Sequence, residues 1–345
     1  MMSADGAVVG IIANPNAGKD IRRLVARGSI FDNNEKVNIV VRLLTALAGL
    51  EVDRVVCMPD TFAIAARAVD RLSGAPAPPV EILEMPVNGV TEDSTRAAAL
   101  LRARGVGCIV CIGGDGTSRA AAKGSGDVPL LAISTGTNNV FPAFVESTCA
   151  GIAAGAIARG LVSHAEGTYR AKRLEVSLDG AFTDLALVDV AGTTDPFVGA
   201  RAIWDVSVVR DIVLTRCALT STGMSAVGAC FRHVDSQDRF GLHLRVGEGG
   251  STVRAVVAPG LLADVPVRAV DEVALGASVA LSPDVRMVAL DGEREVEVRA
   301  GTRAEVRLSG EGPRVVDIPK TLRRVAEAGH LRSNNGQGPT WQGRR

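Results

Sequence analysis

The first half of the chain alternates short, almost wholly apolar runs with longer segments in which apolar residues recur at helical spacing. The short runs are typical of strands that are buried on both faces of a parallel sheet. Strands are predicted over residues 7–13, 54–58, 80–84, 106–112 and 129–134. Helices are predicted over residues 37–50, 61–72, 91–104, 118–123 and 146–159. Because the two kinds of segment alternate, this half is predicted to be α/β, with a doubly wound parallel sheet.

A different pattern begins near Gly167, where apolar and polar residues alternate over short runs. Lys172–Leu178 and Ala181–Val190 flank Asp179-Gly180, and an Asp-Gly pair between two such runs is typical of a hairpin turn. Further strands are predicted over residues 225–231, 242–246, 253–257, 270–275, 285–290, 295–298 and 304–308. One helix, at residues 198–214, is predicted to interrupt them. We therefore expect a β-rich, β-sandwich-like second domain.

These patterns also predict where the domains begin and end. Residues 1–165 are predicted to form the α/β domain, and residues 166–318 the β-rich domain. Residues 319–332 are predicted to form a helix that returns to the first domain. The polar, glycine-rich tail at residues 333–345 is predicted to be disordered.

Composition narrows the classes of function. The 345 residues include 38 basic and 38 acidic side chains, and this zero net charge argues against a nucleic-acid or anionic membrane surface. Aromatic residues make up 3% of the chain, too few for the stacking platforms that bind single-stranded nucleic acid. Small molecules are therefore the expected partners. Whether the β-rich domain also forms a homo-oligomer stays open.

The cysteine pattern argues against a metal or redox centre. Of the six cysteines, only Cys108 and Cys111 have C-x-x-C spacing, and they fall in a predicted strand where positions three apart face opposite sides. Buried thiols are therefore expected there. Because the sequence shows no evident signal peptide and no apolar run of about 18 residues, we expect a cytoplasmic protein.

The most informative motif is Gly113-Gly114-Asp115-Gly116-Thr117, which directly follows a predicted strand and precedes a predicted helix. Glycines at a strand-to-helix turn let the backbone approach a ligand closely, and the helix N-terminus favours anions such as phosphate. Asp115 would repel a phosphate that was only bound there. Its presence indicates proton transfer or metal contact beside a phosphate. The alternative is that Gly-Asp-Gly serves only as a turn.

Two other predicted strands end in polar loops. Asn14-Pro15-Asn16-Ala17-Gly18-Lys19 resembles half of a Walker A loop but lacks the first glycine and the Ser or Thr of that motif. Lys19 would bind a phosphate or be a solvated turn residue. Thr135-Gly136-Thr137-Asn138-Asn139 is rich in short hydrogen-bonding groups. Because its strand follows that of the glycine motif, the two loops are expected to converge on one crevice.

A third acidic motif, Asp291-Gly292-Glu293, has a simple explanation from its spacing alone. Asp-Gly is a favoured hairpin turn, and Glu293 would then be a solvated turn residue.

Taken together, the motifs Gly113–Thr117, Thr135–Asn139 and Asp291–Glu293, in that order across an α/β domain and a β domain, resemble the NAD kinase and diacylglycerol kinase superfamily. The opening segment Ile12–Arg23 is similar to ATP-NAD kinases of the AcoX (acetoin catabolism protein X) type. The resemblance covers about residues 7–325 and implies an N-terminal nucleotide-binding domain and a β-rich substrate domain.

The resemblance also implies roles for individual residues. Asp115 matches the motif carboxylate that deprotonates or orients the acceptor hydroxyl, and Glu293 matches a second candidate base. Asp189 stands where NAD kinases carry an Asn-Glu pair, so it is the candidate for a substrate contact. The implied nucleotide and phosphate contacts are Asn14, Gly18, Lys19, Gly113, Gly114, Gly116, Thr117, Thr135, Gly136, Thr137, Asn138 and Asn139.

The implied activity is transfer of the γ-phosphoryl group of ATP, with Mg²⁺ bound to the nucleotide, to a hydroxyl group. The expected acceptor is the 2′-hydroxyl of NAD, which would give NADP. A lipid or small-polyol kinase of the same superfamily and a non-catalytic protein that binds NAD or ATP are the alternatives.

Overall fold

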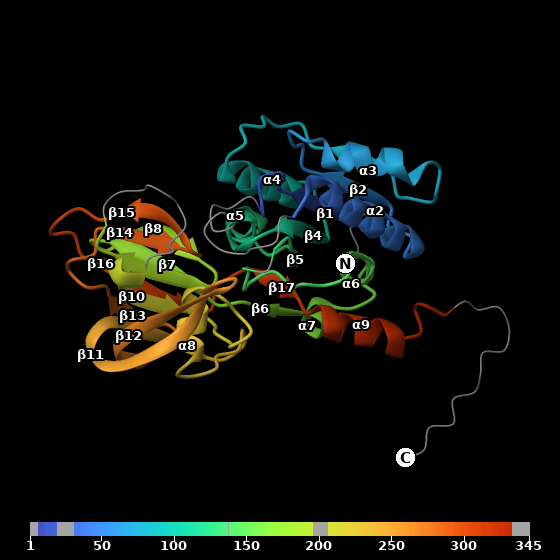
Figure 1. Ribbon diagram of the computed structural model, residues 1–345. Helices are drawn as coiled ribbons and strands as arrows, with labels where there is room; N and C mark the ends of the chain where they lie inside the picture. The colour runs from blue at the N-terminus through green and yellow to red at the C-terminus, as the bar shows by residue number, and fades with distance from the viewer. Residues whose placement is uncertain (1–5, 19–30, 137, 196–205, 333–345) are drawn as a thin grey trace, which may run out of the picture.

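The computed structural model describes residues 6–18, 31–136, 138–195 and 206–332, in two domains that lie side by side (Figure 1). The first domain contains a seven-stranded sheet with the order β3-β2-β1-β4-β5-β17-β6, in which only β6 runs antiparallel to its neighbour. Its strands are β1 (Val8–Ala13), β2 (Arg54–Cys57), β3 (Val80–Ile82), β4 (Cys108–Gly113), β5 (Leu130–Ser134), β6 (Thr168–Arg170) and β17 (Arg314–Val316). The predicted doubly wound parallel sheet is confirmed.

Helices cover both faces of this sheet. One face packs against α2 (Asn33–Gly49), α3 (Ile64–Leu72), α6 (Ser147–Ala158) and α9 (Ile318–Glu327). The other face packs against α4 (Thr91–Ala103) and α5 (Asp115–Ser125). Cys108 belongs to the first of these two cores and Cys111 to the second, so the two thiols face opposite sides of β4, as predicted. Burial raises the pKa of each thiol to about 12, which keeps both thiols protonated and unreactive.

The second domain consists of two antiparallel sheets. The six-stranded sheet has the order β12-β11-β10-β9-β14-β15, and the four-stranded sheet has the order β13-β16-β7-β8. Their strands are β7 (Arg173–Leu178), β8 (Ala181–Ala186), β9 (Asp189–Thr193), β10 (Val209–Leu214), β11 (Phe240–Ala258), β12 (Leu261–Ala274), β13 (Ser278–Ala280), β14 (Met287–Leu290), β15 (Glu293–Glu297) and β16 (Ala304–Ser309). One apolar core draws side chains from both sheets, which makes the domain β-sandwich-like as predicted.

Two predicted elements of this domain are wrong. The helix predicted over residues 198–214 contains a short 3₁₀ turn (Val206–Val208) and then β10, while residues 198–205 lie outside the described ranges. The apolar side chains of β10 enter two cores, one on each face of the sheet, and the periodicity of such a run does not separate strand from helix. The strand predicted over residues 225–231 is instead α8 (Met224–Ala229), which packs on the outer face of the six-stranded sheet. Gly228 lets α8 approach the sheet closely, because a Cβ there would lie 2.2 Å from Leu214 Cδ1.

The chain crosses between the domains twice, and the two crossings lie together. The Ala171 N–H donates to Pro313 O at 3.0 Å, and the Gly312 N–H donates to Ala171 O at 3.1 Å. β6 and β17 lie within the range predicted for the second domain, but both pair in the seven-stranded sheet. After β17, α9 packs against α6 and α7 (His164–Gly167) of the first domain (Figure 1). The tail at residues 333–345 lies outside the described residues.

Candidate functional site

Three loops meet at the carboxyl ends of β1, β4 and β5, which are neighbours in the sheet. The Asn14 N–H donates to Ile112 O at 3.2 Å, and the Asn14 side-chain amide donates to Thr117 Oγ1 at 3.0 Å. On the other side of β4, the Thr135 N–H donates to Gly113 O at 3.1 Å. The loop after β1, the glycine motif and the loop after β5 therefore form one continuous rim, at the edge where open α/β sheets bind ligands.

Asp115 is the first residue of α5, and its carboxylate is half-buried and held by backbone donors. The Phe141 N–H donates to Oδ1 at 2.7 Å, and the Val140 N–H lies 3.1 Å from both carboxylate oxygens. These amides belong to the loop after β5, so they orient the carboxylate across the rim. It does not point into the apolar core.

The glycines of the motif are required by close contacts. A Cβ on Gly114 would lie 2.8 Å from Asn139 Oδ1, and a Cβ on Gly113 would lie 2.5 Å from Thr117 Cβ. The Asn139 side-chain amide donates to Ser134 Oγ at 2.8 Å and to Gly136 O at 3.3 Å, which fixes the loop after β5 against the motif. No side chain caps the N-terminus of α5. An uncapped helix N-terminus beside close-packed glycines suits the binding of phosphate oxygens.

The loop after β1 is shaped by a buried lysine that the sequence analysis missed. Lys36 is fully buried in α2, and its Nζ donates to Ala17 O at 2.7 Å, Asn14 O at 2.8 Å and Pro15 O at 3.2 Å. It also donates to Asn33 Oδ1 at 2.9 Å. The lysine thus holds three carbonyls of this loop against the first turn of α2. The detectable signal is a lysine one residue before the helix predicted over residues 37–50, which α2 extends back to Asn33.

A hairpin of the second domain brings Glu293 to the same rim. Asp291 and Gly292 have φ angles of 51° and 79°, as expected of the predicted Asp-Gly turn, which joins β14 to β15. Glu293 follows this turn, and its Oε1 lies 3.6 Å from the position of a Cβ built on Gly116. The Glu293 carboxylate is therefore a neighbour of the motif that contains Asp115.

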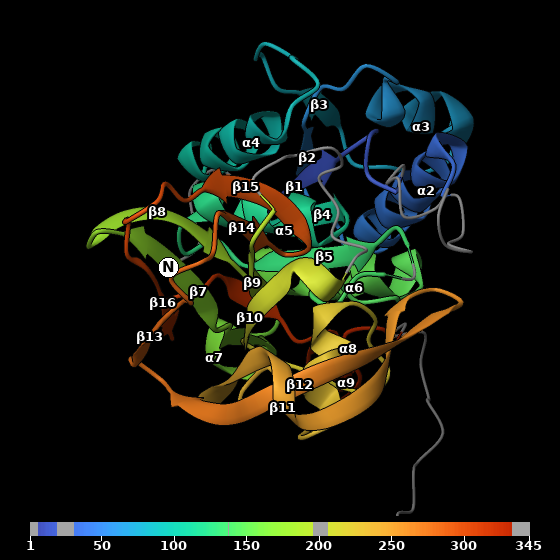
Figure 2. The same ribbon diagram turned by 60° about the vertical axis from the view of Figure 1, so that its left-hand side comes forward.

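Arg119 in α5 joins the two domains next to these carboxylates. Its side chain is 1% exposed and forms ion pairs with Asp184 at 3.3 Å, with Asp291 at 3.6 Å and with Glu295. Lys123, one turn further along α5, pairs with Asp184 at 2.6 Å. Figure 2 shows β15, which carries Glu293 and Glu295, crossing close to α5. The cluster holds this strand against the helix that begins with Asp115.

Asp291 is the buried centre of this cluster. It accepts hydrogen bonds from the backbone N–H groups of Val188 at 2.7 Å, Leu187 at 3.0 Å and Asp189 at 3.3 Å. Burial raises the pKa of the Asp291 carboxyl, while the Arg119 guanidinium and these amides oppose that rise. The three carboxylates around Arg119 in turn raise its pKa against the effect of burial. Asp291 thus does more than turn the chain, because it fixes the hairpin to β9.

The other residues predicted to bind the nucleotide or the substrate do not all lie at this rim. Thr135 Oγ1 and Asn138 Oδ1 are buried at the rim with no hydrogen-bond partner, which leaves both available to a ligand. Asp189 is buried on β9 and reaches the hairpin through backbone hydrogen bonds with Asp291. Gly18 ends the described part of the loop after β1 in a turn with φ 79°. Lys19 and Thr137 lie outside the described residues.

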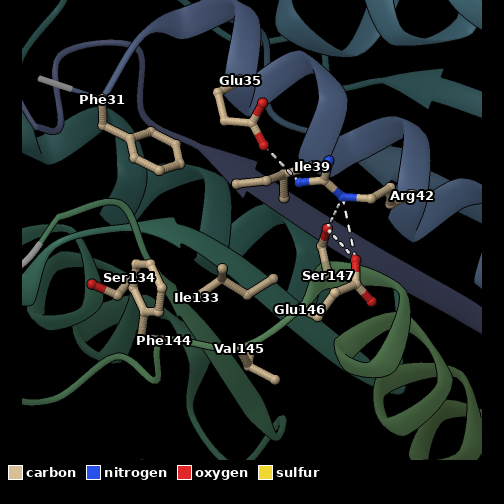
Figure 3. A pocket seen from close by; sticks show the side chains of 10 residues that line it. All are labelled: Phe31, Glu35, Ile39, Arg42, Ile133, Ser134, Phe144, Val145, Glu146 and Ser147. Atoms are coloured by element: carbon tan, nitrogen blue, oxygen red, sulfur yellow. Dashed lines mark hydrogen bonds and ion pairs between the residues drawn. The ribbon is translucent and has the colours of Figure 1, made fainter.

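A cavity of about 240 Å³ lies behind the loop after β5, between the first turns of α2 and α6 (Figure 3). Arg42 in its wall donates to Ser147 Oγ at 2.6 Å and to Glu35 Oε1 at 2.7 Å, so its charge is already paired. Two phenylalanine rings and three aliphatic side chains form the rest of its apolar lining, namely Phe31, Phe144, Ile39, Ile133 and Val145. These walls suit an uncharged ring better than a phosphate.

The described residues contain no cluster of three or more His, Cys, Asp or Glu side chains that could hold a metal ion by themselves. Asp115 and Glu293 could each supply one oxygen to a Mg²⁺ ion whose other ligands are phosphate oxygens and water, which is how this ion is commonly bound with nucleotides. Across the same residues, no helix is both long and apolar enough to cross a bilayer.

Comparisons with known proteins agree with this architecture. Residues 9–161 match the family model of the ATP-NAD kinase N-terminal domain, and residues 172–311 match that of the acetoin catabolism protein X C-terminal domain. Acetoin catabolism protein X of Cupriavidus necator is 35% identical over 338 residues, with 94% of each chain covered.

Among solved structures, yeast NADH kinase complexed with NADH covers 98% of this chain and 91% of its own, with a TM-score of 0.51 and 13% identity. A putative diacylglycerol kinase from Bacillus anthracis str. Sterne covers 91% of this chain and 98% of its own, with a TM-score of 0.48 and 14% identity. The fold is therefore that of the NAD kinases. The predicted resemblance is confirmed, and the chain belongs to the acetoin catabolism protein X family.

Proposed function

We propose that the protein transfers the γ-phosphoryl group of ATP to a hydroxyl of a small acceptor, with the 2′-hydroxyl of NAD as the first choice. The observation that carries the proposal is the position of Asp115, oriented by two backbone amides where three strand-end loops meet beside Glu293. The match to the ATP-NAD kinase N-terminal domain supports NAD as the acceptor.

Phosphoryl transfer requires mainly positioning and charge neutralisation, because the transition state is loose and its charge is spread over oxygens. In the proposed reaction, the acceptor oxygen bonds to the γ-phosphorus as the bond from that phosphorus to the β-phosphate oxygen breaks. Asp115 accepts the hydroxyl proton, and ADP leaves. Asp115 and Glu293 would each offer an oxygen to a Mg²⁺ ion bound with ATP, which would supply neutralisation of phosphate charge.

Other residues of the rim would bind the phosphates, the acceptor hydroxyl and the ribose. Close-packed backbone at Gly113 and Gly114, together with Gly116 and the uncapped start of α5, would receive the phosphates. Glu293, held by the hairpin next to Gly116, would orient the acceptor hydroxyl or share its proton. The Asn138 and Thr135 oxygens without partners would accept hydrogen bonds from ribose hydroxyls.

The test incubates the purified protein with Mg²⁺ and ATP and a panel of acceptors containing NAD, NADH, diacylglycerol and small diols. Mass spectrometry then identifies which acceptor gains one phosphoryl group, and a coupled assay follows ADP release. The expected result is NADP formation with stoichiometric ADP. Gain of mass by diacylglycerol or a diol alone would move the assignment to a lipid or polyol kinase. Nucleotide binding without ADP release would replace the enzyme by a binding protein.

A further inference from the structure

Two cations, the buried Lys172 and the half-buried Arg216, lie at the domain junction without an ion-pair partner among the described residues. Lys172, directly before β7, is 4% exposed, and its Nζ donates to Phe240 O at 2.6 Å and to Asp235 O at 3.1 Å. Arg216 follows β10. Neither residue forms an ion pair with a described Asp or Glu, so neither positive charge is directly neutralised by a carboxylate there.

Arg216 lies against the loop that orients the proposed base. Its guanidinium carbon is 5.0 Å from the centre of the Phe141 ring, and the Phe141 N–H is the one that donates to Asp115 Oδ1 at 2.7 Å. Nε and Nη2 of Arg216 are buried and have no hydrogen-bond partner. Buried N–H groups of a cation that lack an acceptor are costly, so this arrangement suits an anion that arrives from outside the chain.

Arg216 differs from the other arginines that lie over phenylalanine rings. In the described ranges, three arginines lie over phenylalanine rings. Arg232 lies over Phe240 but also pairs with Glu272, and Arg67 lies over Phe62 but donates to Asn34 Oδ1 at 3.0 Å. Arg216 is the one of the three with buried nitrogens left unbonded.

We propose that Arg216 determines the specificity for the acceptor by binding its phosphate or pyrophosphate group, so that the acceptor is a phosphate-bearing molecule and not a neutral lipid. This inference rests on the proposed function for the meaning of "acceptor". A planar guanidinium with two free N–H groups fits two phosphate oxygens at once. The unbonded Asn138 Oδ1, three residues before Phe141, offers the acceptor a hydrogen bond for a hydroxyl in the same region.

Lys172 adds to the positive potential without contacting the ligand. Burial lowers the pKa of Lys172 to about 8, a shift that the charge of Arg216 favours and that the carboxylates of Asp235 and Asp238 oppose. An anion bound at Arg216 would therefore also stabilise the charged form of Lys172.

The test measures binding by calorimetry to the full chain, with the donor site filled by the β,γ-imido analogue of ATP. The ligands are NAD and AMP, which carry phosphate, and adenosine, which does not. The proteins are the wild type, Arg216→Met, Arg216→Lys and the matched control Arg232→Met. We expect Arg216→Met to raise the dissociation constants of NAD and AMP by about 10–100-fold, in line with the loss of hydrogen bonds to a charged group. Adenosine affinity should not change, Arg216→Lys should recover part of the loss, and the control should match the wild type.

Equal affinity of the wild type for AMP and adenosine, or an Arg216→Met variant that binds NAD like the wild type, would overturn the inference. The proposed function fails separately. Arg216-dependent AMP binding without any transfer to NAD keeps the anion site and rejects the kinase. Transfer to NAD with no dependence on Arg216 keeps the kinase and rejects the anion site.

Discussion

Replacing Arg119 with methionine should destabilise the protein more than the loss of any exposed ion pair. The substitution preserves most of the side-chain volume and removes a charge that is 1% exposed and surrounded by Asp184, Asp291 and Glu295. Asp184 keeps Lys123 at 2.6 Å, and Glu295 keeps partial access to water. Asp291 has neither, because its side chain is fully buried. The cost therefore arises mainly at Asp291.

Removing one partner of a buried ion pair costs about 3–5 kcal/mol. For a chain of this length that unfolds in one cooperative step, the same loss lowers the melting temperature by about 4–7 °C. Urea unfolding and calorimetry of the full chain measure both quantities. In a kinase assay the variant should also lose turnover, because β15 carries both Glu295 and Glu293 and is no longer fixed to α5.

Two further variants test whether the cost of Arg119→Met comes from leaving Asp291 buried without its partner. Arg245→Met removes an exposed pair with Asp271 at 2.7 Å and should cost about 1 kcal/mol or less. In an Asp291→Asn background, Arg119→Met should cost far less than in the wild type, because the buried carboxylate is already gone. The explanation is refuted if Arg119→Met costs no more than Arg245→Met, or if its cost is the same in both backgrounds.

Three more outcomes follow from the site. Glu293→Gln should lower kcat by about 10–100-fold and leave the melting temperature unchanged; a larger loss than that of Asp115→Asn would exchange the roles of the two carboxylates. Lys36→Met frees three loop carbonyls, so it should weaken Mg·ADP binding about 10-fold and cost about 1–3 kcal/mol of stability; calorimetry showing wild-type affinity would contradict the shaping role. Burial acts to raise the pKa of Asp211, but hydrogen bonds from His243 at 2.9 Å and the Ser282 N–H at 2.8 Å outweigh it and lower that pKa. The charged Asp211 carboxylate therefore stabilises the fold above pH 3.8, and this stabilisation is lost as the pH falls through the lower pKa of the folded state. In urea unfolding experiments, the difference in stability between the wild type and Asp211→Asn should disappear at acid pH and persist at basic pH.

The first domain was predictable because its strands are buried on both faces and its helices carry clear apolar stripes. The convergence of the loops after β4 and β5 was equally accessible, because these strands are consecutive in the sequence and adjacent in the sheet. Local pattern was not sufficient for β1, which lies beside β4 although β2 and β3 stand between them in the sequence.

In the second domain the prediction was wrong at two segments, because the spacing of their apolar residues fits both a strand and a helix. β10 sends apolar side chains into the cores on both faces of the six-stranded sheet, and a short apolar run of this kind also fits a helix. α8 was mistaken for a strand because its small residues, among them Gly228, show no helical stripe and serve close packing on the sheet.

Contacts between segments distant in the sequence were not predictable at all. No local pattern in the sequence marks Arg119, yet it contacts residues 65 to 176 positions away. Asp291 was explained fully by its turn, and nothing local showed that its carboxylate would receive three amides from residues 187–189. Both roles depend on how the two domains face each other.

Turnover of NAD and ATP by Asp115→Asn, compared with the wild type, tests the central claim most directly. Asparagine keeps an oxygen for the Val140 and Phe141 amides, so the loop should stay in place while the proton acceptor is lost. We predict that kcat falls by about 10²–10⁴-fold with unchanged nucleotide affinity and melting temperature. Wild-type NADP production by this variant would contradict the account.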